Sequence, residues 1–485
     1  MLCDFCGSDF DPKDFDVDRD AEEQNIAQEN EQSDEGSFDT YDVTVFTCPQ
    51  CGGELMSVDE NTAAAFCSFC GASTILSSRI AKEKRPEFII PFSKTKEDCK
   101  EAYRKLVRRA LFIPKEYKSE ACIDGFRGIY MPYWSYDVKQ SGPVNLKGQT
   151  EHRSGDYIIT KYYSLTGNID ATYDGISYDA SSSFSDSISE ALAPYDITKR
   201  IPFETSYMSG YYADISDVGK ELYSQEASAL AYNYSLNRIK SETKEFHKYT
   251  ITGDSATDKK PGSAFSSRAM KGHSAMFPVW FMSYRNGDRV TYATVNGQTG
   301  KIAADLPIDP VKYLLLSGIL AAVIFVILNL FLVLTPKVVL FLSSILTAAV
   351  FIINAMQRSD IKKAETGEDD KGLNYLRSGK RKENGEENSG ETGKKDQKKK
   401  AEKSPDDVKM PAPEMIITIL GVISIIIGVL MYFVLDVVSD VPYYVLCIID
   451  AAIFMVCFRY TLVNYNRVAT RKLPQFDRKG GDDRA

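Results

Sequence analysis

The segment YLLLSGILAAVIFVILNLFLVL occupies residues 313–334 and contains no charged residue. As an α-helix it would be roughly 33 Å long, enough to cross the ~30 Å hydrocarbon core of a bilayer. A second uncharged run, 338–356, follows after Thr335-Pro336-Lys337. A connection of three residues that includes a proline allows only a tight reversal, so the sequence predicts a transmembrane hairpin at 312–356.

Two further apolar runs lie near the end of the chain. Residues 415–435 and 441–463 are separated by a short loop that contains Asp436 and Asp440. They predict a second transmembrane hairpin at 415–463, and four spans in total. The alternative is a helical hairpin buried in a soluble core. It is disfavoured because both runs of the first pair are long enough to insert into a membrane and neither contains a charge.

Asp450 falls near the middle of the fourth predicted span. A carboxyl group at this depth is costly unless it is protonated or paired, which makes it a candidate functional group. Asn329 and Asn354 are its candidate partners, and interhelical hydrogen bonds that hold the bundle together are the simpler role. That role is favoured because no basic residue lies deep in any span to pair with Asp450.

The distribution of Lys and Arg predicts the orientation of the spans. Basic residues follow the second and fourth spans, whereas the turns between paired helices hold only Lys337, and cytoplasmic flanks are the basic ones. We therefore expect a multi-pass protein of the cell membrane with both termini cytoplasmic, and residues 1–20 show no secretory signal. The basic flanking residues are Arg358, Lys362, Lys363, Arg459, Arg467, Arg471 and Lys472.

Two cysteine knuckles lie before the membrane half, Cys48-Pro-Gln-Cys51-Gly52 and Cys67-Ser-Phe-Cys70-Gly71. Fifteen residues separate the inner cysteines, a spacing typical of a zinc ribbon, which we place at 46–80. Four thiolate ligands complete a tetrahedral Zn²⁺ shell and leave no open position for water, so the predicted role is structural. A thiol redox pair is the alternative, and the doubled motif in a cytoplasmic segment disfavours it.

A third knuckle, Cys3-Asp-Phe-Cys6-Gly7, has no matching pair. Cys3 and Cys6 could form half of a site that another chain completes, compete for the first ion, or bind no metal. The surrounding segment, 1–45, is strongly acidic and is predicted to be disordered. It could be a solvating tail, an electrostatic mask or a lure for a basic partner.

Residues 86–311 have the composition of a folded α+β domain. Ser93 or Thr95 can cap a helix whose apolar positions recur with helical period, and whose other side, 100–109, is basic. Arg285-Asn286-Gly287-Asp288 predicts a hairpin turn. Both tryptophans follow a proline by two residues, in Met131-Pro132-Tyr133-Trp134 and Phe277-Pro278-Val279-Trp280, which suggests two related strands with buried indoles.

The remaining segments are a charged linker at 357–414, predicted to be disordered, and a cytoplasmic tail at 464–485. Nucleotide-binding, serine-hydrolase and zinc-protease motifs are absent from the sequence, and its three histidines, His152, His247 and His273, are scattered. The chain is therefore predicted not to be an enzyme. Its fold class is a multi-domain membrane protein: a small zinc ribbon, an α+β cytoplasmic domain and α-helical transmembrane hairpins with four spans.

The order of the Cys48–Cys70 ribbon, Phe88-Ile89-Ile90-Pro91-Phe92, the two tryptophan motifs and Val295-Asn296-Gly297-Gln298-Thr299-Gly300-Lys301 resembles a group of uncharacterised bacterial zinc-ribbon membrane proteins. Some members carry names taken from primosomal replication helicases, but helicase motor motifs are absent from this sequence. The last strand pair is also similar to the closing hairpin of PepSY-type domains. The resemblance implies a cytoplasmic domain tethered to a membrane hairpin, and it implies no activity, substrate or catalytic residues.

Three functions remain as hypotheses. The first is a non-enzymatic adaptor, anchored in the lipid bilayer, that presents a zinc-stapled surface to a cytoplasmic protein. The second is a membrane-tethered nucleic-acid-binding protein that uses the ribbon and the basic helix face at 100–109. The third is a transporter or membrane enzyme whose chemistry centres on Asp450. The sequence does not determine the oligomeric state.

Overall fold

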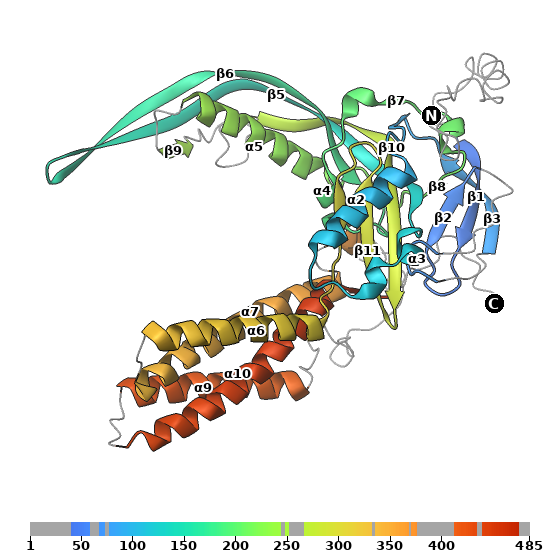
Figure 1. Cartoon of the computed structure of the whole chain (residues 1–485). Helices are drawn as coiled ribbons and strands as arrows, with labels where there is room; N and C mark the ends of the chain where they lie inside the picture. Colours follow the sequence, from blue (N-terminus) through green and yellow to red (C-terminus); the bar gives the residue numbers. More distant parts are fainter. Residues whose placement is uncertain are drawn as a thin grey trace, which may run out of the picture.

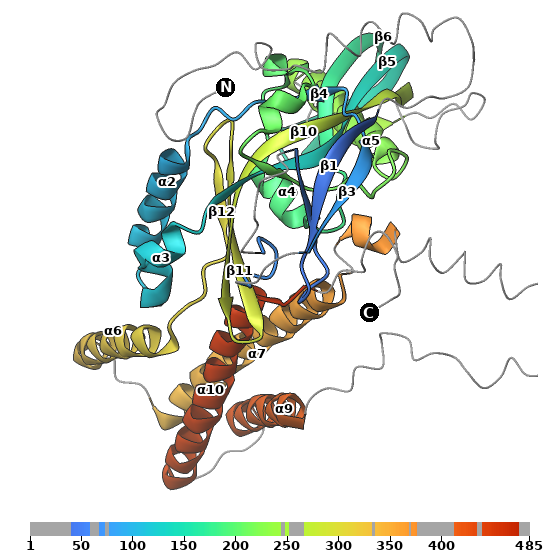
Figure 2. The same ribbon diagram turned by 90° about the vertical axis from the view of Figure 1, so that its right-hand side faces the viewer.

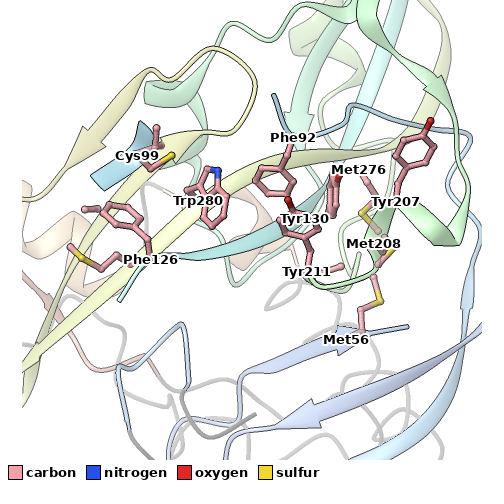
Figure 3. Packing of buried hydrophobic residues seen from close by; sticks show 14 of the residues in the cluster. Met56, Phe92, Cys99, Phe126, Tyr130, Tyr207, Met208, Tyr211, Met276 and Trp280 are labelled. Atoms are coloured by element: carbon pink, nitrogen blue, oxygen red, sulfur yellow. The ribbon is translucent and has the colours of Figure 1, made fainter. Parts of the chain in front are cut away.

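The computed structural model combines a large β-sheet domain with a group of long apolar helices (Figure 1). Figure 3 shows part of the core of the sheet domain. The residues that the structure describes are 40–58, 67–72, 77–243, 248–251, 266–331, 335–367, 370–375, 412–433 and 439–474.

Two long antiparallel strands form the centre of the sheet, β5 (Arg127–Ser154) and β10 (Ser266–Asn286). They carry the two tryptophan motifs, and Met131 lies opposite Phe277 across the strand pair. Trp280 is buried, as expected, whereas Trp134 is only partly buried and donates its indole N–H to the Val218 carbonyl at 2.7 Å. Pairing of related motifs on neighbouring strands supports the predicted internal relationship.

The other strands extend this sheet on both sides, and short helices connect them. The strand order is β12-β11-β10-β5-β8-β2-β1-β3, with β4, β6, β7, β9 and β13 paired outside this path. The remaining strands and 3₁₀ helices are β4 (Phe88–Ile89), η2 (Lys115–Lys118), β6 (Tyr157–Asp179), η3 (Ile197–Lys199), β7 (Ile201–Pro202), η4 (Thr205–Met208), β8 (Tyr212–Ala213), β9 (Lys248–Ile251), β11 (Arg289–Asn296), β12 (Ile302–Ala304) and β13 (Arg471–Lys472).

The predicted ribbon is joined to the domain sheet and starts earlier than expected. Its strands are β1 (Thr40–Thr47), β2 (Glu54–Ser57) and β3 (Ser77–Lys84), and β2 pairs with β8 through Met56 and Ala213. The segment 1–45, predicted to be disordered, therefore overlaps a strand, because Tyr41, Val43 and Val45 alternate toward the core. Residues 1–39, with Cys3 and Cys6, lie outside the described residues.

Four helices lie against the sheet: α2 (Lys96–Arg109), α3 (Glu120–Ile123), α4 (Asp186–Leu192) and α5 (Ser224–Glu242). The N-cap of α2 is Thr95, one of the two predicted caps, and it forms a capping box with Asp98. Tyr103 is buried on the core side of this helix as its spacing predicts. The helical spacing of apolar residues continues to Leu111, but this side chain is 71% exposed because α2 ends at Arg109.

An aromatic cluster fills the core between the sheet and these helices (Figure 3). Phe92 stacks on Tyr211 with a centroid separation of 4.3 Å and meets Trp280 edge-on. Gly297 packs so closely against this cluster that an added Cβ would lie 2.6 Å from the Phe92 ring. The glycine that the family resemblance includes is therefore required for aromatic packing.

Four long helices follow the sheet domain: α6 (Pro310–Phe331), α7 (Pro336–Thr366), α9 (Ala412–Phe433) and α10 (Val441–Val468). Three of them, α6, α7 and α10, are long and apolar enough to cross a membrane, whereas Ile419–Phe433 of α9 counts as a shorter apolar helix. This differs from the prediction of four spans. Helices α7, α9 and α10 pack together, whereas α6 stands apart from them in Figure 2 and has no buried residue in its apolar stretch, Pro310–Leu328.

The predicted linker at 357–414 begins later than expected. Helix α7 continues to Thr366 and ends at Gly367, whose φ of 67° suits the left-handed C-cap. Beyond it, the Lys371 N–H donates to Asp186 of α4 at 2.8 Å, and the Lys371 ammonium pairs with Glu226 of α5. Composition suggested disorder here, but these residues contact the sheet domain. Residues 376–411 lie outside the described part of the chain.

Candidate metal centre

The four predicted ligands, Cys48, Cys51, Cys67 and Cys70, are buried together, and their sulfur atoms all lie within 4.8 Å of one another. The Cys48 and Cys70 sulfurs are 3.8 Å apart, and those of Cys51 and Cys67 are 3.7 Å apart. A tetrahedral ion with metal–sulfur bonds of about 2.3 Å requires sulfurs about 3.8 Å apart. A disulfide requires about 2 Å, so the geometry fits a shared metal ion.

Each knuckle has the same local geometry. In the first, Gly52 donates its N–H to the Cys48 carbonyl, and in the second Gly71 donates to Cys67. Their φ angles, 74° and 70°, lie in the left-handed region that favours glycine. The Gly53 N–H also points at the Cys51 sulfur, 3.4 Å away. The short motif therefore aims two thiols per turn at one point.

The protonation of the four thiols favours a bound ion, in agreement with the geometry of the cluster. The hydrogen bond with Cys51 raises the pKa of the Cys67 thiol far above its usual range, whereas hydrogen bonds with Cys51 and Cys67 lower the pKa of Cys70 to about 2. These opposite shifts arise because four crowded sulfurs cannot all lose their protons unless a cation balances their charge, and a metal-bound thiol is deprotonated. The four sulfurs complete the shell, which leaves no position for a reacting water.

The second knuckle rests on the hairpin formed by β10 and β11. The Tyr292 hydroxyl of β11 donates to the Phe69 carbonyl at 2.7 Å, between Cys67 and Cys70. On β10, the Arg285 guanidinium donates to the Gln50 side chain of the first knuckle at 2.6 Å. A Cβ on Gly71 would lie 3.2 Å from the Cβ of Arg285. Both knuckles are thus held by one hairpin.

The same hairpin binds the end of helix α10. Arg289 of β11 donates to the carbonyls of Arg467 and Thr470 at 2.8 and 2.6 Å, and its guanidinium lies 3.4 Å from Glu365 of α7. These carbonyls have no helical donor at a C-terminus, so the arginine caps the helix. Strand β13 then pairs with β11. A short path of contacts joins the cysteine cluster to α7 and α10.

Asp450 lies 4% exposed among α7, α9 and α10. Its Oδ1 accepts hydrogen bonds from Ser424 of α9 and from Thr347 of α7, the latter at 3.3 Å. The predicted partner Asn354 instead bonds to the Cys457 carbonyl and to Asn464. The side chain of Asn329, the other predicted partner, is outside the described part. Asp450 therefore joins three helices through hydroxyl groups, as the bundle-holding interpretation predicts.

The basic face of α2 is largely neutralised by acidic side chains. Lys100 lies 2.9 Å from Glu97 and 3.0 Å from Asp124. Arg104 pairs with Glu120 at 2.6 Å, and Lys105 pairs with Glu101 at 2.8 Å. Nucleic-acid affinity depends on cations that are available to phosphate, so these contacts weigh against the nucleic-acid hypothesis.

One polar group was missed by the sequence reasoning. His273 of β10 lies between two carboxylates, with Nδ1 2.6 Å from Glu87 and Nε2 3.2 Å from Asp137. These residues are far apart in sequence, and no short motif contains them. His152 lies exposed on β5, and His247 falls outside the described residues.

No family model matches the chain, and no solved structure matches it. The chain is similar to the uncharacterized protein YdjG of Bacillus subtilis (strain 168), with 27% identity over 317 residues that cover 54% of this chain and 90% of YdjG. This distant likeness agrees with the resemblance to uncharacterised bacterial proteins. The name of YdjG states no activity, and nothing in it points to a helicase.

Proposed function

We propose that this chain is a membrane-anchored adaptor without catalytic activity, in which a structural Zn²⁺ ion holds a cytoplasmic domain in a fixed form for a protein partner. The observation that carries the proposal is the β10–β11 hairpin. Through Tyr292 it holds the cysteine cluster, and through Arg289 it holds α10. A closed four-sulfur site in this position can stabilise a surface but offers no open coordination position for chemistry.

The proposed topology has four spans, with the domain and both termini in the cytoplasm. Three helices reach the required length, and the contacts of α9 support a fourth. Gly421 and Gly428 of α9 approach Phe351 and Ser344 of α7, and Tyr432 stacks on Phe341 at 4.3 Å. Helix α9 thus lies antiparallel along α7, through the same layer. The basic ends of α7 and α10 lie beside the sheet domain, which supports a cytoplasmic domain.

The experiment compares partners that co-purify with the full-length chain and with a Cys48→Ser, Cys51→Ser variant. We expect the variant to remain in carbonate-washed membranes but to lose bound zinc and its specific partners. A Cys99→Ser, Cys122→Ser variant is the matched control, because these buried thiols lie outside the cluster. An unchanged partner set in a metal-free variant would contradict the adaptor proposal.

A further inference from the structure

The β5–β6 hairpin continues far beyond the rest of the sheet. Its pairing runs from Tyr133 opposite Asp179 to Ser154 opposite Tyr157, and Gly155 lies in the turn between the strands with a φ of 61°. In Figure 1 it forms a long curved arm, with α5 beneath its base. We call the end of this hairpin, residues 149–163, the arm tip.

The arm tip exposes a group of large apolar and aromatic side chains. Tyr157 is 78% exposed, Ile158 is 70% exposed and Tyr162 is 71% exposed, and Ile159 and Tyr163 also face solvent. Successive residues of a strand point to opposite faces, so apolar groups cover both faces of the tip. Large apolar side chains that are exposed close together in this way are typical of a contact surface.

The two edges of the arm tip differ in polarity. Ser154 pairs with Tyr157, and Arg153 pairs with Ile158. Farther along, His152 pairs with Ile159, and Gln149 pairs with Tyr162. In each of these pairs the β6 residue is apolar or aromatic and the β5 residue is polar or charged. The intervening pairs, Glu151 with Thr160 and Thr150 with Lys161, are polar on both strands, so the apolar side chains of the tip lie on β6 but share that strand with Lys161.

The position of the arm favours a lipid surface over a protein groove. In Figure 1 the arm leaves the upper end of the sheet domain and helices α6, α7, α9 and α10 leave its lower end, and both extend to the left. A flat protein surface would cover one face of a ribbon, whereas the interfacial layer of a bilayer surrounds both. Tyrosine is enriched at this interface because its ring is apolar and its hydroxyl is polar.

We propose that the arm tip lies in the interfacial layer of the bilayer that holds the apolar helices, with its aromatic and aliphatic side chains among the headgroups and the upper ends of the acyl chains. The proposal rests on the proposed membrane anchoring. Within the described residues β6 pairs only with β5, and an unpaired backbone edge is costly in hydrocarbon. The interface, where headgroups and water satisfy backbone groups, is therefore its depth. The arm thereby acts as a second membrane contact.

The test introduces a tryptophan at the arm tip of the full-length chain. Ile158→Trp is reconstituted into phosphatidylcholine vesicles whose acyl chains carry bromine near the headgroup, and the fluorescence of the wild type, from Trp134 and Trp280, is subtracted. The matched control is Ile80→Trp on β3, because Ile80 is 74% exposed and lies on the ribbon, away from the arm. We expect bromine to quench the added fluorescence of Ile158→Trp and to leave that of Ile80→Trp unchanged.

Two results separate the failures. A chain that stays in the vesicles after carbonate washing, but whose Ile158→Trp fluorescence is as insensitive to bromine as that of Ile80→Trp, overturns the arm proposal alone. A chain that carbonate releases overturns the membrane anchoring on which it rests. Equal quenching at both positions also counts against the arm proposal, because it shows no preference for the tip.

Discussion

Two antiparallel hairpins of this protein have the same secondary structure and opposite surroundings. In β10–β11, strand β11 is buried at seven of its eight positions, and the hairpin touches the cysteine cluster and the ends of α7 and α10. In β5–β6, the first half of β6 is exposed on both faces. Strand pairing alone therefore does not fix the role of a hairpin. The first is a structural connector, and the second is a projecting surface.

The largest expected difference between the two hairpins is the cost of removing an aromatic ring. Trp280→Ala on β10 removes a side chain that is 2% exposed, and we expect a loss of about 3–5 kcal/mol in stability. Tyr162→Ala on β6, where the ring is 71% exposed, should change stability by less than about 0.5 kcal/mol. Chemical denaturation followed by circular dichroism measures both. Equal losses of stability in the two variants would contradict the different roles assigned to the two hairpins.

A smaller effect is expected from the arginines of the two hairpins. Arg289→Ala removes the arginine donor to two carbonyls at the end of α10, and we expect a cost of about 2 kcal/mol with faster hydrogen exchange at β13. Arg153→Ala on the arm removes only a contact with the nearby Gly155 carbonyl among those described. It should leave exchange at β13 unchanged. Unaltered exchange in Arg289→Ala would show that this arginine does not join the hairpin to the helix.

The smallest effect concerns the buried end of β6. Asp179 is 3% exposed, and burial, with the nearby Asp186 carboxylate, raises its pKa well above the usual value. Stability from the protonated form is complete below the unfolded pKa of about 3.9 and is lost as pH rises through the folded pKa.

Asp179→Asn removes this titration. Relative to the wild type, the variant should gain stability as pH rises from 5 to 8. Thermal unfolding at several pH values measures the gain. Glu151→Gln, at an exposed position on the arm, is the control and should show no such trend. A constant difference between Asp179→Asn and the wild type would contradict the assignment.

Local patterns in the sequence were sufficient to predict several elements. Cysteine spacing identifies the four sulfurs that lie together, because each knuckle is one short turn. Thr95 is recognisable as a cap from its position before an amphipathic helix, and Asn286-Gly287 lies at the β10–β11 turn as predicted. In each case the decisive interactions join residues that are close in sequence.

Features that depend on packing between distant segments were not predictable in this way. The partners of Asp450 follow from the rotation of three helices, so Ser424 and Thr347 replace the expected asparagines. The full length of β6, to Asp179, also does not follow from the local pattern, because polar residues interrupt the apolar side chains beyond residue 165. The arm gains its strand structure from pairing with β5 and not from a buried face.

The metal content of the full-length chain tests the central claim most directly. The chain would be extracted with detergent from carbonate-washed membranes, purified under reducing conditions and analysed by mass spectrometry for bound metals. We predict about one zinc ion held by the four-sulfur cluster of each chain, and its loss in Cys48→Ser, Cys51→Ser. A wild-type chain that is metal-free, or that retains as much zinc when Cys48 and Cys51 are replaced, would contradict the account.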